Sequence, residues 1–277
     1  MTYTEWLRVR RTLLVYTIVL VSILVSSIIA IFFTHTDVTV SSQAPSIAAA
    51  HAHSATKIVP LREAMVTGFL KHHTTVPLSI LFFMAGFLAT IVATVLACSL
   101  STERNHTPLS WTKPASRVRF ALAYLGVDTA GVAIAFIIAL VVSLILIWSV
   151  GVASFIRVDR DAGLMLLMMA GIALAYHGVI RAASVGFAGR GGAIAGSSWG
   201  VAYLLIALAN IPFPRPYHVT FVALNFLNPL AYITDFTDSS TWSGIVPLSV
   251  GARIACVWLL ALVTATITLT IYRRAEA

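Results

Sequence analysis

The sequence contains few charged residues and few lysines. Of its 277 residues, 10% are charged and only three are lysines. Soluble domains average about 25% charged residues. Hydrophobic residues make up 59% of the chain. This composition excludes an ordinary water-soluble domain and indicates that most of the protein lies in a bilayer.

The motifs that would give this chain an active site are also missing. There is no G-x-S-x-G nucleophile elbow, no H-E-x-x-H zinc motif and no G-x-x-x-x-G-K-[ST] phosphate loop. None of the three lysines follows a glycine. We therefore expect no catalytic residues, no ATPase site and no cofactor bound by this chain.

Metal sites and disulfides are equally poorly supported. Five of the eight histidines lie between residues 34 and 76, but no cysteine or carboxylate there has a spacing that would complete a metal site. We expect a solvated loop and no metal. The two cysteines, Cys98 and Cys256, fall within or at the end of apolar runs near opposite membrane faces, so we expect packing residues and no disulfide.

Six apolar runs are each long enough to cross a bilayer, which takes about 20 residues of helix. They are Thr12–Phe33, Pro77–Leu100, Phe120–Val150, Gly163–Ala183, Ala193–Ile211 and Pro247–Tyr272. Strands of a membrane barrel would be about 10 residues long and alternate in polarity, which these runs do not. The sequence predicts an all-α polytopic membrane protein with six transmembrane helices in one domain, residues 1–277.

The basic residues lie beside the spans, so the net charge of +8 does not indicate nucleic-acid binding. Eleven Lys and Arg residues fall on the side that holds both termini, and seven fall on the other side. Three of those seven lie in the long first loop, which carries little topological weight. The positive-inside rule therefore places both termini in the cytoplasm.

Three segments outside the spans have features of their own. Residues 1–12 predict an amphipathic elbow helix at the membrane surface, with Trp6 and Val9 on one stripe, although a simple basic anchor is the alternative. In the outer loop 34–76, we expect an irregular first half and a helix that begins at Pro60. The region 212–246 contains an apolar piece too short to span, which predicts a re-entrant segment of one or two helices.

The fifth span begins with glycines four residues apart, Gly192, Gly196 and Gly200. Glycines at this spacing share a helix face and let a second backbone approach closely. Packing within the chain and packing against a second subunit are both compatible with this pattern.

Ionisable residues inside the predicted spans are few and therefore functional candidates. Asp128 lies about two turns into the third span, and His177 lies within the fourth, one turn before Arg181. A proton relay through Asp128 and His177 is one interpretation. A structural pair between Asp128 and Arg181 is the other.

One polar segment, residues 101–119, separates the second and third spans. It contains Ser101-Thr-Glu103-Arg104 and Leu109-Ser-Trp-Thr-Lys113-Pro114-Ala-Ser116-Arg117, and the following span includes Val127-Asp128. This arrangement resembles the type-2 family of ABC (ATP-binding cassette) transporter permeases. There an acidic–basic pair closes span two and a Pro-x-Ser-Arg element precedes span three. The elbow, the re-entrant segment and the run Asn228-Pro229-Leu-Ala-Tyr232 are similar to that family as well.

The resemblance implies the permease subunit of an ATP-driven exporter in the plasma (inner) membrane. Its partners would be an ABC ATPase subunit, which holds ATP and Mg²⁺, a second permease copy or paralogue, and the lipid bilayer. The residues implied in coupling to the ATPase are Glu103, Arg104, Lys113, Pro114, Ser116 and Arg117. Pro114 prevents a continuous helix there, because it lacks an amide hydrogen and clashes with the preceding turn.

Two other functions remain as alternatives at this stage. A proton-coupled secondary carrier would use Asp128 and His177. A non-transporting assembly subunit would use the glycine face of the fifth span.

Overall fold

The computed structural model describes residues 2–40, 55–72, 75–102, 117–186, 190–233 and 245–274. Within these residues, six helices are long and apolar enough to cross a membrane. They are α1 (Thr2–Phe33), α3 (Leu78–Thr102), α5 (Arg117–Val150), α6 (Ala162–Gly186), α7 (Gly191–Asn210) and α9 (Val250–Arg274). The predicted all-α polytopic membrane fold is confirmed.

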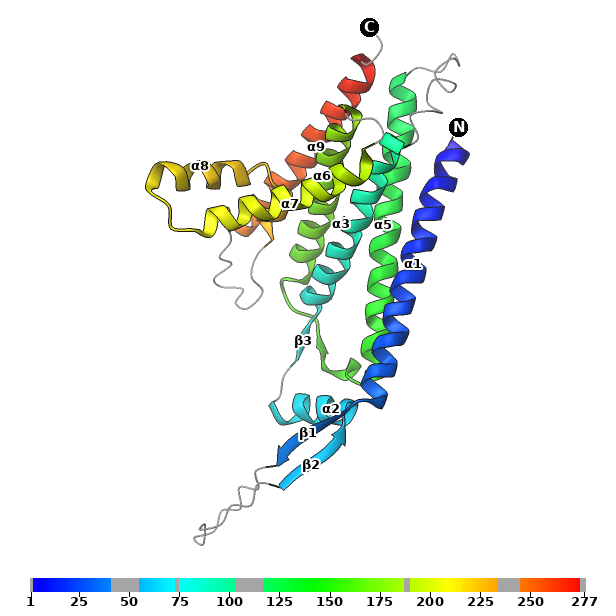
Figure 1. Cartoon of the computed structure of the whole chain (residues 1–277), viewed down its shortest axis with the longest axis vertical. Helices are drawn as coiled ribbons and strands as arrows, with labels where there is room; N and C mark the ends of the chain where they lie inside the picture. Colours follow the sequence, from blue (N-terminus) through cyan, green and yellow to red (C-terminus); the bar gives the residue numbers. More distant parts are fainter. Residues whose placement is uncertain are drawn as a thin grey trace.

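Five of the six helices form an elongated bundle, and α7 projects obliquely from its side (Figure 1). Helices α3 and α6 form the centre, because 56% and 61% of their most apolar windows are buried, against 11% for both α1 and α7. Helix α1 starts and α9 finishes at the same end of the bundle, which we call the terminal end.

Glycines allow the central helices to pack closely. At Gly86 of α3, an added Cβ would lie 2.4 Å from the Cβ of Met169, and at Gly178 of α6 it would lie 2.2 Å from Oγ1 of Thr264. Helices in a membrane have no hydrophobic drive toward one another, so close backbone approach and dispersion contacts hold them together. The core therefore depends on the absence of side chains at these positions.

The other end of the bundle carries a small extramembranous unit. Strand β1 (His35–Val40) pairs antiparallel with β2 (Ala55–Pro60), and α2 (Leu61–His72) follows directly. The predicted helix after Pro60 is confirmed. The two strands were not predicted, since their pairing joins segments separated by residues 41–54, which lie outside the described residues.

A few side chains attach this unit to the bundle. The guanidinium of Arg62 donates to the carbonyl of Val150 over 3.1 Å and lies 5.3 Å from the ring centroid of Phe32. Strand β3 (Val76–Pro77), just before α3, pairs in parallel with β4 (Ile156–Arg157). Strand β4 directly follows the 3₁₀ turn η1 (Ala153–Phe155). The Asp159 carboxylate accepts a bond of 3.0 Å from the amide of Ser79 and caps α3.

The N-terminal segment does not form a separate elbow. Helix α1 runs without interruption from Thr2 to Phe33, so residues 2–12 continue the first span. Val9 and Leu13, from the predicted apolar stripe, are buried in the bundle, and Trp6 is 37% exposed. The continuity follows from this burial, because contacts of α1 with the bundle extend through the segment that was expected to lie on the surface.

Two short helices follow α7, as expected for the region 212–246. They are α8 (Arg215–Asn225) and the 3₁₀ helix η2 (Pro229–Tyr232). The amide of Asn228 donates to the carbonyl of Ala202 over 3.0 Å. Ala202 lies eight residues before the end of α7, so the chain returns about 12 Å along that helix. This return is compatible with the predicted re-entry, which stays a prediction.

Neither Cys98 nor Cys256 forms a disulfide in the part of the chain that the structure describes. Cys98 is buried and Cys256 is half-buried, each within a span.

The close approach at Gly178 can be tested with alanine substitutions. Gly178→Ala forces its new methyl group into Thr264, and overpacking of this kind costs about 1–3 kcal/mol. Gly126→Ala is the control, because apart from the adjoining backbone of α5 no atom of the described residues lies within 4 Å of its added Cβ. There, the better helix propensity of alanine should stabilise by up to about 1 kcal/mol. Thermal unfolding in detergent should shift in opposite directions for the two variants, and equal shifts would contradict the packing.

Candidate functional site

A buried cluster of charged side chains joins three helices near the terminal end of the bundle. Its centre is the Asp128 carboxylate of α5, which is 0% exposed. One carboxylate oxygen accepts a hydrogen bond from Arg8 of α1, and the other accepts one from Arg181 of α6. Nε2 of His177 lies 3.1 Å from that second oxygen. A single carboxylate thus links α1, α5 and α6.

Helical spacing places the members of this cluster. Tyr124 precedes Asp128 by four residues on α5, and His177 precedes Arg181 by four on α6, so each pair shares one face of its helix. Close approach of α1 to α5 occurs at Gly131, where an added Cβ would lie 2.6 Å from a methyl of Val9. That contact, next to Arg8 in the chain, brings the guanidinium within reach of Asp128.

The cluster holds two guanidinium groups against one carboxylate. Both guanidinium groups lie over the ring of Tyr124, Arg8 at 4.4 Å and Arg181 at 4.3 Å from its centroid. The ring offers its negative face to both cations. Arg8 also donates to the carbonyl of Leu96 in α3 over 3.1 Å. Ring and carbonyl therefore compensate part of the excess positive charge.

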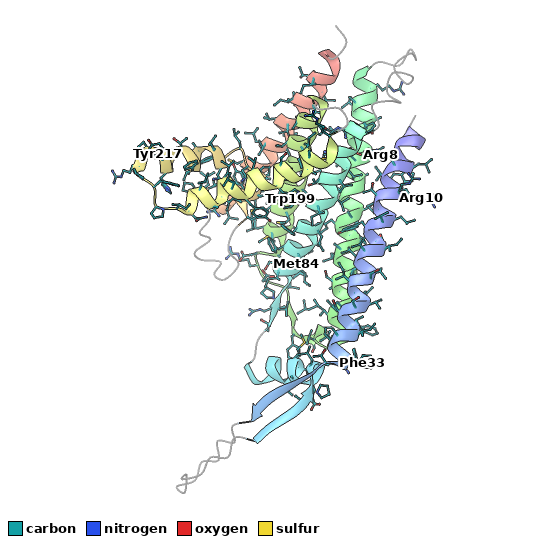
Figure 2. The ribbon with its side chains drawn as sticks, viewed as in Figure 1. Arg8, Arg10, Phe33, Met84, Trp199 and Tyr217 are labelled. Carbon is teal, nitrogen blue, oxygen red and sulfur yellow. The ribbon has the colours of Figure 1, made fainter. Side chains whose placement is uncertain are left out.

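The cluster lies near the helix ends that border the polar segment, residues 101–119. Asp128 lies eleven residues after the start of α5, about 16 Å along the helix, and Leu96 lies six residues before the end of α3. Figure 2 shows Arg8 on the side of α1 that faces the bundle and Arg10 pointing away. Residues 103–116 connect the end of α3 to the start of α5. The cluster thus lies between these two helix ends and the rest of the bundle.

The sequence predicted part of this cluster. Asp128 and His177 are brought together, and the expected pair between Asp128 and Arg181 is confirmed. The contributions of Arg8 and Tyr124 were missed. Arg8 lies in the segment expected to form a surface elbow or a basic anchor, although its position beside the stripe residue Val9, which is buried, was a usable signal.

The glycine face of α7 is open. Gly192, Gly196 and Gly200 are all exposed. Apart from the adjoining backbone of α7, an added Cβ at these positions would meet no atom of the described residues within 4 Å. Packing of these glycines within the chain is therefore not observed. The subunit interface remains as a prediction.

Most of the residues assigned to ATPase coupling lie outside the described residues, namely Glu103, Arg104, Lys113, Pro114 and Ser116. Arg117 is the first residue of α5. Across the ranges that the structure describes, no group of three His, Cys, Asp or Glu side chains could hold a metal ion. The loop histidines His51, His53 and His73 are not among those residues.

The cluster is suited to holding helices together. Arg8, Arg181 and His177 are cationic or aromatic partners of one carboxylate, and the side chains of all three lie away from water. Separating α1 or α6 from α5 would leave a charge buried without its partner, which is strongly unfavourable. We infer that the terminal-end halves of these three helices move as one unit.

Comparisons with protein-family models, with curated proteins and with solved structures found no match to this chain.

The Asp128→Asn substitution tests the energetic role of the cluster. It keeps the shape of the side chain but leaves two buried guanidinium groups without their counter-charge, which should cost about 3–5 kcal/mol. Asp159→Asn serves as control, because that carboxylate accepts a backbone hydrogen bond at the other end of the bundle and should contribute only about 1 kcal/mol. Thermal unfolding in detergent measures both variants. Equal destabilisation would show that the cluster contributes no more to stability than a single backbone hydrogen bond.

Proposed function

We propose that this chain is the permease subunit of an ATP-driven ABC exporter in the plasma membrane, with both termini in the cytoplasm. The observation that carries the proposal is the polar segment 101–119, whose Glu103-Arg104 and Pro114-Ala-Ser116-Arg117 elements resemble the coupling loop of type-2 permeases. In this proposal the chain has no ATPase site, and ATP and Mg²⁺ bind to a separate ATPase subunit.

The buried cluster supports this function by its position. Helices α3 and α5 flank the polar segment, and Arg8 contacts both of them, through Leu96 and Asp128. Arg181 extends the connection to α6. A force applied at the segment would therefore be carried to three spans through one ion cluster.

A rigid connection matters because the ATPase in such a system acts from outside the membrane. If the ends of α3 and α5 could shift without their neighbours, movement of the segment would be lost in local bending. Asp128 makes that separation costly, because it is shared among α1, α5 and α6. Closure of the ATPase subunits would then tilt these helices together.

A second permease copy or paralogue completes the proposed assembly. Gly192, Gly196 and Gly200 form an exposed face on α7, and 11% of the most apolar window of that helix is buried. Two such faces could approach closely, as small-residue stripes do in membrane helices. Helix α7 projects from the side of the bundle (Figure 1).

The proton-coupled carrier remains a second candidate, because Asp128 and His177 lie 3.1 Å apart inside the spans. The two guanidinium groups on the same carboxylate weigh against it, since a relay needs a group that can release its partners. Transport that survives ATP depletion and collapses with the proton gradient would select this alternative.

Charge reversal in the polar segment tests the coupling. The chain would be co-expressed with the ABC ATPase that we expect to be encoded beside it. Glu103→Arg and Arg117→Glu should each reduce the amount of copurified ATPase at least tenfold, because they reverse charges offered to the partner groove. Membrane insertion should not change.

Arg160→Glu is the matched control, since this exposed arginine lies in the loop before α6, at the opposite end of the bundle from Arg117. It should leave ATPase copurification at the level of the unmodified chain. Normal copurification with both segment variants, or loss with Arg160→Glu alone, would refute the coupling assignment.

The glycine face is tested by bulk at its centre. Gly196→Leu should weaken dimerisation in nanodiscs at least tenfold, because the larger side chain keeps two α7 helices apart. The unfolding temperature of the monomer should change little, as an added Cβ here would meet no described residue outside the adjoining backbone of α7 within 4 Å. Gly163→Leu, also on an open position but on α6, should leave the dimer intact. Single-molecule photobleaching would count the copies, and an unchanged Gly196→Leu dimer would exclude this face.

A further inference from the structure

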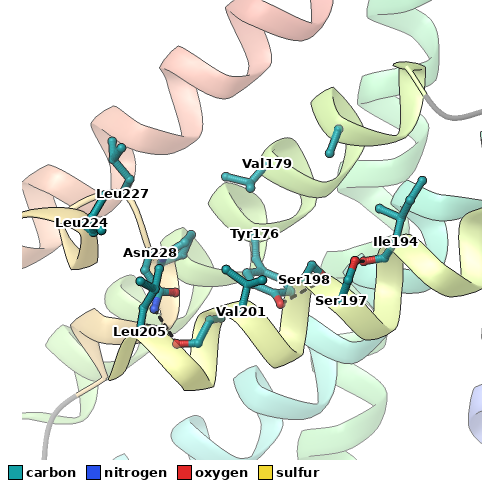
Figure 3. Close-up of a pocket in the computed structure, with 13 residues that line it drawn as sticks. Tyr176, Val179, Ile194, Ser197, Ser198, Val201, Leu205, Leu224, Leu227 and Asn228 are labelled. Atoms are coloured by element: carbon teal, nitrogen blue, oxygen red, sulfur yellow. Dashed lines mark hydrogen bonds between the residues drawn. The ribbon is translucent and has the colours of Figure 1, made fainter. Parts of the chain in front are cut away.

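We propose that a cavity between α6, α7, α8 and η2 binds an acyl chain of a membrane lipid. The cavity has a volume of about 360 Å³. Figure 3 shows it along α7, with Tyr176 and Val179 of α6 on one wall and Leu224, Leu227 and Asn228 at one end. It is separate from the ion cluster, since none of the cluster residues lines it.

The walls fit hydrocarbon. Among the described residues that line the cavity, none is charged, and most are aliphatic. The polar groups already use their donors inside the protein. Ser198 donates to the carbonyl of Ala195 over 2.7 Å, and Ser197 donates to that of Ile194 over 3.2 Å. A ligand here is not required to supply or receive an ion pair.

The shape of the cavity favours a chain over a compact molecule. Its lining on α7 extends from Ile194 to Leu205, eleven residues, which corresponds to about 16 Å along the helix. Known ligand pockets start at roughly 300 Å³, so the volume suffices for one chain but not for a large ring system.

The cavity opens toward the surroundings of a span. Val201 is 55% exposed and Leu227 is 67% exposed, and both lie on its rim. Because α7 is long and apolar enough to cross a membrane, lipid is the medium that we expect at this rim. An apolar groove there can be filled by a lipid chain without any cost of removing the chain from water.

A second permease copy on the glycine face would leave the cavity open. At 3.6 residues per turn, the cavity-lining residues of α7 centre about 170° away from Gly192, Gly196 and Gly200. The two features therefore occupy opposite faces of the same helix, and the dimer and the lipid chain are compatible.

The experiment uses the purified chain in phosphatidylcholine nanodiscs that contain a small fraction of lipid with a diazirine at the end of one acyl chain. After illumination, mass spectrometry locates the labelled peptides. We expect labelling concentrated on peptides of α6, α7 and η2. Ala183→Phe and Ser197→Phe fill the cavity from two different walls and should each reduce that labelling at least fivefold.

Ala130→Phe is the control, because Ala130 is exposed on α5 and does not line the cavity. It should leave the labelling unchanged. Labelling spread evenly over exposed helices such as α1, or unchanged labelling in both filling variants, would overturn the proposal. No ATPase or ATP is present, so this test is independent of the proposed export function.

Discussion

The arrangement of this bundle depends on one buried carboxylate. Asp128 accepts hydrogen bonds from guanidinium groups of two other helices, and Tyr124 stacks against both cations. Charge is expensive at membrane depth, so each member of such a cluster requires the others. The consequence is geometric: α1 and α6 are held at fixed positions on α5. Apolar packing alone, which tolerates sliding, would not fix them in this way.

The rest of the bundle uses the opposite strategy, in which the lack of side chains brings helices together. Gly86 and Gly178 admit Met169 and Thr264 so closely that no Cβ could be accommodated without a shift. Such contacts are numerous and individually weak. They set distances, whereas the ion cluster sets which faces meet. Helix α7 projects from the side of the bundle, with an exposed glycine face on one side and the cavity on the other.

Length and apolarity are local properties, so the six spans could be predicted from sequence. The ends of five helices agree with the predicted runs within three residues, whereas α1 begins ten residues earlier than predicted. The pair of Asp128 and Arg181 was accessible for a similar reason, since few ionisable residues lie within spans. Arg8 was not, because a basic residue near a terminus normally stays among headgroups, and only the packing of Val9 against Gly131 draws it inward. The β1–β2 pairing and the cavity depend on contacts between distant segments, which no local pattern reveals.

The attachment of Arg62 to Val150 and Phe32 has a mechanical consequence. It attaches α1 and α5 to α2 at the end of the bundle away from the terminal end. The ion cluster holds α1 and α5 to each other near the terminal end. Because α1 and α5 are held together at both ends, the pair resists shear and twist but can still rotate as one body. A rearrangement that begins at the terminal end would therefore be transmitted along α1 and α5 to the other end of the bundle. Strands β1 and β2 and helix α2 would move with that end.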